Sequence, residues 1–316
     1  MDPLSEIIRS TRLSGGLFVD AQFTAPWSVL AQVREEECRL VVDTPVQMIA
    51  YHFVVEGRLL ACIEGEHSCI EVEAGEVVLF PRNDTHRLAS APDIPPRWAR
   101  EFRAPGAERR ITHGGGGDPT YIVCGFLVSE TLFNPLIAAL PPILKLNLQE
   151  AGSRDWVEAS VRFAVTELAK GQLASSSLIS KLSELLLTEA VRQYARTLDD
   201  SEAGWLKGLS DPKIGRALTM IHADPTTPWS ADSLAREVGM SRSAFVDRFT
   251  TLVGLPPIRY LTRWRLQTAK LTLRETKVTV AQLAYSVGYE SEESFSRAFK
   301  REFGLPPSKW RDLEKA

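Results

Sequence analysis

The last third of the chain contains one pattern written twice, and this repeat constrains the fold more than any other feature. From Ser241 in the first copy and from Ser291 in the second, the same residue types recur at steps of 4, 4, 5, 3 and 3. A chance match at so many positions is very improbable, so we infer an internal duplication. The matched positions are Ala235, Gly239, Ser241, Phe245, Phe249, Gly254, Pro257 and Tyr260 in the first copy, and Ala284, Gly288, Ser291, Phe295, Phe299, Gly304, Pro307 and Trp310 in the second.

Each copy predicts two short helices joined by a tight turn. In the first copy Ser230 is a favourable N-cap, Gly239 supplies the left-handed residue that ends a helix, and Ser241 caps the next helix. Gly288 and Ser291 divide the second copy in the same way. Two such helices form a helix-turn-helix, a motif that places its second helix in the DNA major groove.

The segment between the copies and the charge distribution favour the same function. Residues 257–274 predict one connecting helix of ~25 Å, which can hold two recognition helices about one DNA turn, ~34 Å, apart. Residues 212–316 contain 17 Lys and Arg against 11 Asp and Glu, a net charge of +6, whereas residues 1–211 have a net charge of −9. A basic end on an acidic body is typical of a nucleic-acid-binding domain.

This stretch resembles the DNA-binding domain of the AraC/XylS family of transcriptional regulators. The resemblance is carried by Gly288-Tyr-Glu-Ser-Glu-Glu-Ser-Phe-Ser-Arg-Ala-Phe-Lys-Arg-Glu-Phe-Gly-Leu-Pro-Pro307 and covers about a third of the chain. It implies a bipartite domain of seven helices, two recognition helices in successive major grooves, and control of transcription.

The outward faces of the two second helices supply the candidate DNA contacts. Arginines can read guanine there, while the other polar side chains reach bases or phosphates. Acidic residues crowd the start of the second recognition helix and would repel phosphates, so we expect the helix from Ser241 to Val253 to read more of the bases. The candidates are Ser241, Arg242, Ser243, Asp247, Arg248, Ser291, Glu292, Ser296, Arg297, Lys300 and Arg301.

The first part of the chain has a different pattern, of short runs rich in β-branched and aromatic residues that are separated by glycine turns. Many short strands at regular spacing, with no helices between them, are typical of an antiparallel barrel or jelly roll. The predicted strands are 17–20, 27–33, 46–55, 58–63, 68–72, 76–80 and 121–128.

One segment of this region resembles the second cupin motif. In Gly75-Glu-Val-Val-Leu-Phe-Pro-Arg-Asn-Asp-Thr-His86, a glycine, a proline and a histidine stand at the motif's spacing, with Asn83 where a glycine is usual. His52 lies where the first cupin motif places its histidines, although Val54 replaces the second histidine of that pair. The resemblance implies a cupin-type sensor domain over about 15–130, such as some AraC-family proteins carry.

The two histidines have three alternative roles. They could line an effector pocket, for which we name His52, His86, Phe53 and Phe80. They could also bind a transition metal together with Cys124, or simply be hydrogen-bonded residues of the barrel wall. We assign no metal, no other cofactor and no catalytic residue.

Cys62 and Cys69 flank a predicted hairpin turn and could face each other across two strands. A redox-sensing pair is one interpretation, and the interpretation that we favour is two buried, inert thiols.

Beyond residue 140 the pattern becomes helical. Apolar residues at helical spacing predict antiparallel helices over 155–170 and 175–196, which either pack on the barrel or form a dimer interface. We therefore divide the chain into a cupin-like sensor with an N-terminal arm at 1–140, a helical pair at 141–198, an acidic linker at 199–211 and the DNA-binding domain at 212–316.

Composition excludes a membrane protein class. No apolar run approaches the roughly 18 residues that a membrane span needs, and the N-terminus has no secretory pattern. We therefore expect an α+β chain of two domains, in which a cupin-like antiparallel β-barrel and helices precede an all-α double helix-turn-helix domain.

The expected function is transcription regulation, with activation by a cytoplasmic, nucleoid-associated protein that responds to a small-molecule or redox signal. The expected partners are promoter DNA, RNA polymerase, a small-molecule effector and a second copy of the chain. The alternative is a metal-dependent cupin enzyme fused to a DNA-binding domain, which would need a full set of metal ligands.

Overall fold

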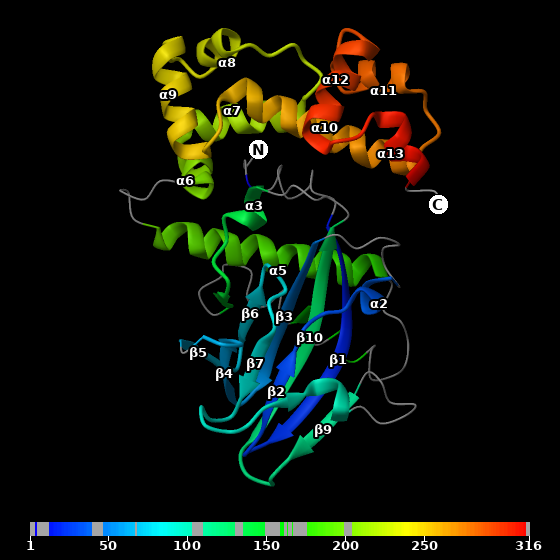
Figure 1. The fold of residues 1–316 in the computed structure, drawn as a ribbon. Helices are drawn as coiled ribbons and strands as arrows, with labels where there is room; N and C mark the ends of the chain where they lie inside the picture. The colour runs from blue at the N-terminus through cyan, green and yellow to red at the C-terminus, as the bar shows by residue number, and fades with distance from the viewer. Residues whose placement is uncertain are drawn as a thin grey trace. The chain divides into compact units, whose positions relative to one another are not determined.

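The computed structural model describes residues 13–39, 47–66, 68–102, 110–129, 135–148, 176–198 and 204–313, together with positions 4, 159, 160, 163 and 166. The chain divides into two compact units, which are drawn in Figure 1. The sheet unit comprises Arg12–Glu130 and Leu140–Thr197. The helical unit comprises Met1–Thr11, Thr131–Ala139 and Leu198–Ala316. Within the described residues, no helix is both long enough and apolar enough to cross a bilayer.

Two β-sheets build the sheet unit, and their apolar faces meet in one core that includes Val19, Phe23, Trp27, Leu59 and Phe80. The first sheet has the order β11 (Leu144–Asn147), β6 (Glu76–Phe80), β3 (Gln47–Glu56), β10 (Pro119–Ser129), β1 (Ser14–Thr24) and β9 (Arg110–Gly114). The second has the order β5 (Cys69–Glu73), β4 (Arg58–Ile63), β7 (His86–Ala89), β2 (Ser28–Ala31) and β8 (Arg97–Trp98).

The expected closed antiparallel barrel is wrong in two respects. Within the described residues the sheets are open, because β11 and β9 are edge strands of the first sheet and β5 and β8 are edge strands of the second. The pairing is also mixed, since β1 pairs parallel with β9 and β2 pairs parallel with β8. Topology explains the first parallel pair. Strands β9 and β10 follow each other in the chain and lie on opposite sides of β1. Because β10 is antiparallel to β1 and the chain reverses direction between β9 and β10, β9 runs parallel to β1.

The predicted strands are confirmed at β1 to β6 and at β10, while β7, β8, β9 and β11 were not predicted. Strand β11 lies inside the segment expected to be helical, because Leu144 and Leu146 alternate with polar residues and pair with β6. The helix expected over 175–196 is α5 (Ser176–Thr197). The helix expected over 155–170 lies largely outside the described residues.

Helix α5 covers one face of the first sheet, where it contacts β1, β10 and β11 (Figure 1). Leu182, Leu186 and Leu187 are buried there. The Ser183 hydroxyl is hydrogen-bonded to the buried Tyr51 hydroxyl, with 2.9 Å between the oxygens. This apolar face therefore packs on the unit's own sheet.

The helical unit contains short helices around two helix-turn-helix motifs. Their bounds are α3 (Pro135–Ala138), α6 (Trp205–Ser210), α7 (Pro212–Ala223), α8 (Ala231–Glu237), α9 (Arg242–Val253), α10 (Pro257–Glu275), α11 (Val280–Ser286), α12 (Glu292–Phe303) and α13 (Pro307–Leu313). The segment expected as a linker, 199–211, is helical from Trp205, because Trp205 and Leu206 are buried where α6 packs against α7 and α9.

Candidate functional site

The two helix-turn-helix motifs have the same backbone geometry. Gly239 and Gly288 follow the first helix of each copy with φ of 65° and 83°, in the left-handed region that favours glycine. The next amide then bonds back to the first helix, from Met240 to the Ala235 carbonyl and from Tyr289 to that of Ala284, each with an N···O distance of 2.9 Å. The turn of the second motif has one residue more than that of the first, and this residue, Glu290, follows the Tyr289 hydrogen bond.

Buried aromatic side chains anchor the second helix of each motif in the core of the helical unit. Phe245 and Phe249 on α9, and Phe295 and Phe299 on α12, are fully buried. The ring centroids within each pair are 5.6 Å apart. Burying one stripe of each helix leaves the opposite stripe facing solvent, as the sequence pattern predicts.

Solvent reaches most of the side chains that were expected to contact DNA. Ser291 and Ser296 are half-buried, and Ser241 and Ser291 also act as N-caps, accepting from the amides of Ala244 and Ser294. The exposed candidates are Ser241, Arg242, Ser243, Asp247, Arg248, Glu292, Arg297, Lys300 and Arg301.

Three of the candidate arginines already have carboxylate partners. The Arg242 Nε lies 3.3 Å from the Asp232 Oδ2, and the Arg297 Nη1 lies 3.3 Å from the Glu293 Oε1. Both of these pairs are well exposed, so they are weak and their arginines can turn to another anion. Arg248 differs, because its Asp211 partner has a side chain that is only 7% exposed.

Sequence reasoning missed the contribution of Arg265 on the connecting helix α10. Its guanidinium donates to the carbonyls of Pro225 and Thr227 at 2.6 and 2.7 Å, and so ties the loop between α7 and α8 to α10. A Cβ at Gly288 would lie 2.8 Å from the Arg265 Nη2. The turn of the second motif thus packs directly against this arginine, which links the two motifs.

In the sheet unit, a cavity of about 40 Å³ lies between the two sheets. Apolar side chains from β1, β2, β7, β9 and β10 form most of its wall, and charged or polar side chains complete it. By the usual minimum of roughly 10–15 Å³ for one water, this volume holds a few waters or one small molecule. The charged lining residues are Arg34, Glu37 and Arg100, and the histidines and cysteine are His52, His86 and Cys124.

His52, His86 and Cys124 form a hydrogen-bonded row in the cavity wall. The Cys124 Sγ lies 2.8 Å from His52 Nδ1, and His52 Nε2 lies 2.8 Å from His86 Nε2. His86 Nδ1 in turn donates to the Asp84 carbonyl at 2.8 Å. Both histidines are almost fully buried. Burial lowers the pKa of His86 to about 4, and burial with the neighbouring His86 lowers the pKa of His52 well below 6.5.

The row does not have the geometry of a metal site. His52 presents a different ring nitrogen to each neighbour, so the three side chains do not converge on one point. Over the part of the chain that the structure describes, no cluster of three or more His, Cys, Asp or Glu could hold a metal ion. The residues present therefore do not fit the metal centre of a cupin enzyme.

The two phenylalanines proposed with these histidines lie elsewhere. Phe53 is buried on the face of β3 that carries Tyr51, opposite the face of His52. Phe80 stacks on the His86 ring with centroids 3.7 Å apart, and so supports His86 without lining the cavity. The sequence pattern missed the lining residues from β1 and β2 and Ile122 from β10, which come from distant parts of the chain.

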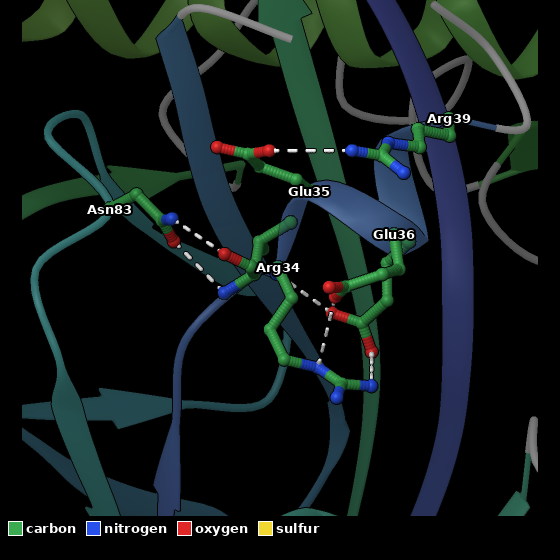
Figure 2. Close-up of polar contacts among 7 residues, drawn as sticks. Arg34, Glu35, Glu36, Arg39 and Asn83 are labelled. Carbon is green, nitrogen blue, oxygen red and sulfur yellow. Dashed lines mark hydrogen bonds and ion pairs between the residues drawn. The ribbon is translucent and has the colours of Figure 1, made fainter. Parts of the chain in front are cut away.

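Asn83 explains the departure from the cupin motif. Its φ is 54°, in the left-handed region that a glycine usually fills and that asparagine tolerates. Its amide side chain accepts from the Val33 amide at 2.9 Å and donates to the Val33 carbonyl at 2.7 Å. Figure 2 shows these bonds beside Arg34 and the glutamates of the short helix α2 (Glu35–Cys38). Asn83 thus anchors the segment that leads from β2 to the cavity-lining Arg34.

Cys62 and Cys69 form a disulfide between the paired strands β4 and β5. The expectation of two inert thiols is therefore wrong, because the antiparallel register places the two residues directly opposite each other. The Arg87 guanidinium lies 3.6 Å from the Cys62 sulfur and 3.9 Å from that of Cys69. The free cysteines among the described residues are Cys38 and Cys124, both buried.

Comparison with known proteins assigns both units to families. Residues 2–196 match the family described as Cupin, and residues 234–312 match the family described as Helix-turn-helix domain. The chain is 30% identical over 314 residues to a protein of Streptomyces lividans described as an AraC-like transcription regulator, with 98% of each chain covered. It is 31% identical over 316 residues to a protein of Streptomyces antibioticus with the same description and coverage.

Among solved structures, the chain is similar to an AraC-type DNA-binding regulator from Chromobacterium violaceum. The identity is 28%, the TM-score is 0.31, and the match covers 33% of this chain and 94% of that chain. The named relatives are regulators, and they give no support to the alternative of a cupin enzyme. With a match to a cupin domain over more than half of its length, and with relatives at 30% identity or more over 98% of it, the chain belongs to the AraC family of DNA-binding transcription regulators.

Proposed function

We propose that this regulator controls transcription in response to a small molecule that binds in the cavity between its two sheets. The observation that carries the proposal is the cavity, a hollow with mostly apolar walls and a few polar groups from separate elements. Small-molecule sites in proteins have this construction. A volume of about 40 Å³ restricts the occupant to a small molecule.

The DNA-contacting surface in this proposal is formed by α9 and α12. The weakly paired Arg242 and Arg297, with the exposed Lys300 and Arg301, contact bases and phosphates. Helix α9 reads more of the bases, because Glu292 and the other acids at the start of α12 repel phosphates. Serines and Asp247 complete the surface, and Arg248 contributes through its effect on α9.

Several further features belong to the same proposal. The regulator acts as an activator in the cytoplasm, on the nucleoid, where it recruits RNA polymerase as a homodimer. The sensor spans 1–140, the coupling segment spans 141–198 and includes strand β11 and helix α5, and the DNA-binding domain follows. These points are supported by the family and by the basic charge of residues 212–316.

A reporter experiment tests the sensor cavity. Expression is measured from the DNA upstream of the chain's own gene, with a panel of small aldehydes, ketones and carboxylates as probes. Ala31→Leu and Ala99→Leu place larger side chains in the cavity wall, and Ala91→Leu adds the same volume at a half-buried alanine that does not line the cavity. We expect the two cavity variants to lose the response and to bind DNA with unchanged affinity. An unaltered response in both, with the folds intact, would refute the proposal.

A further inference from the structure

We propose that Cys124 is a covalent binding site for small α,β-unsaturated carbonyl compounds that enter the cavity. This inference rests on the proposed function and adds the chemical class of the signal. It stands on the position of the Cys124 thiol in the cavity wall and on the histidine row behind it.

The row has a fixed direction of proton donation. The Asp84 carbonyl can only accept, so His86 Nδ1 carries a proton. His86 is neutral because its burial disfavours the charged ring, so His86 Nε2 accepts from His52 Nε2–H. His52 is neutral for the same reason, which leaves its Nδ1 as an acceptor for the thiol proton of Cys124.

A thiol that donates to a neutral imidazole has the arrangement of an activated nucleophile. The neighbouring base takes the proton only as the sulfur attacks, so the imidazolium that burial disfavours forms together with the enolate charge, and it keeps its hydrogen bond to His86 Nε2. His86 thereby orients His52, as the third group of a catalytic triad orients its base.

The proposed addition is balanced without an oxidant or a reductant. The Cys124 sulfur attacks the β-carbon of the double bond, an S–C bond forms, and the π electron pair moves toward the carbonyl as an enolate. The thiol proton passes to His52 Nδ1 and then to the α-carbon. The product is a thioether, and His52 returns to its neutral form.

The apolar part of the wall, next to Cys124, favours an uncharged compound of this class. Ala21, Leu88 and Ile122 line it beside Cys124, so an uncharged molecule enters without losing strong hydration. Cys38, the other free cysteine among the described residues, is fully buried and does not line the cavity. Burial, followed by Glu37 and Glu35, raises its pKa to about 12, so it serves as an internal control.

The test uses the full-length protein and but-3-en-2-one, with intact-mass spectrometry and peptide mapping. We expect one adduct per chain, located on Cys124, and no adduct from the saturated butan-2-one. Cys124→Ala and Cys124→Ser should abolish the adduct, whereas Cys38→Ala should keep it. His52→Gln should slow the addition by about 100-fold, the lower range for loss of a general base. Circular dichroism confirms that each variant is folded.

Several outcomes would overturn the inference. These are an adduct on Cys38 in place of Cys124, no adduct at all, or an unchanged rate in folded His52→Gln. A change in DNA affinity caused by butan-2-one, with Cys124 inert to the enone, would overturn the covalent site and leave the proposed sensing intact. An adduct on Cys124 without any change in affinity for upstream DNA would support the covalent site and contradict the proposed sensing.

Discussion

Arg248 on α9 binds Asp211 at the start of α7, with 2.7 Å between the Arg248 Nε and the carboxylate oxygen Oδ2. The other oxygen of Asp211 accepts the amides of Lys213 and Ile214, each at 2.9 Å. One carboxylate therefore caps α7 and holds the recognition helix of the first motif. The sequence predicts Arg248 as a DNA-contacting residue, and the structure shows that its side chain holds α9 against α7.

The first prediction tests whether the ion pair of Arg248 stabilises the fold, whereas that of Arg242 does not. Because the Arg248 side chain is 56% exposed, its ion pair contributes modestly, and Arg248→Ala should lower the free energy of unfolding by about 1 kcal/mol. Asp211→Ala should cost about 2 kcal/mol, since it also removes the helix cap. Urea unfolding followed by circular dichroism measures both. The matched control Arg242→Ala, whose partner Asp232 is exposed, should leave stability within about 0.5 kcal/mol. Equal losses for Arg242→Ala and Arg248→Ala would contradict this assignment.

The second prediction concerns DNA binding by the helical unit. Binding by phosphate contacts releases counterions, so affinity for the DNA upstream of the chain's own gene should fall steeply between about 50 and 200 mM salt. If Arg242 contacts a phosphate, Arg242→Ala should weaken binding and reduce the salt slope by about 1. Fluorescence anisotropy measures both quantities. A flat salt dependence would rule out binding driven by phosphate contacts.

The third prediction concerns the backbone at Asn83. Asn83→Gly keeps the left-handed backbone but removes two hydrogen bonds to Val33, which should cost about 2 kcal/mol. Asn83→Ala removes the same two hydrogen bonds but keeps a Cβ at φ 54°, so it should be about 1 kcal/mol less stable than the glycine variant. Chemical unfolding of both variants gives the comparison. If the alanine variant is the more stable of the two, the backbone argument fails.

The fourth prediction is a pH dependence of the helical unit. His222 Nε2 is hydrogen-bonded to the Tyr260 hydroxyl at 2.7 Å, and burial lowers the pKa of His222 to about 3. Between pH 3 and 6.5 the unfolded chain therefore binds a proton that the folded chain does not. The stabilisation by this neutral histidine is complete above pH 6.5 and decreases as the pH falls, by up to about 1.4 kcal/mol per pH unit.

Hydrogen–deuterium exchange in α7 and α10 reads this effect within the helical unit. His222→Gln keeps a polar partner for Tyr260 and cannot titrate in this range. Exchange in α7 and α10 should therefore rise less in the variant than in the native chain as the pH falls from 6.5. An identical pH dependence in the variant would show that another group is responsible.

The fifth prediction concerns the Cys62–Cys69 disulfide. Because the bond closes a short loop of the chain, reduction or Cys62→Ser with Cys69→Ser should lower the stability of the sheet unit by about 2 kcal/mol. Thermal unfolding with and without a thiol reductant measures this loss. The double variant should be insensitive to the reductant. If native protein and double variant respond equally to the reductant, the effect does not come from this bond.

Local signals explain why the C-terminal helices could be predicted from the sequence. Ser230, Ser241 and Ser291 cap helices where the sequence placed caps, and Gly254 and Gly304 end helices with left-handed backbones. Each of these signals acts over a few residues, so it can be read without knowing the fold. Helix α6 lies inside the segment predicted as a linker and has no such local signal, because the burial of Trp205 depends on contacts with α7 and α9.

The sheet unit shows what the sequence alone determined and what only the tertiary structure decided. Alternating apolar residues determined most of the strands, because a strand's two faces are set by a period of two residues. The parallel position of β9 and the pairing of Cys62 with Cys69 depend on register and strand order. Likewise the duplicated motif determined two outward-facing helices, while the contact with Asp211 singled out Arg248 among their arginines. Contacts between residues far apart in the chain leave no local pattern, and only the folded structure brings them together.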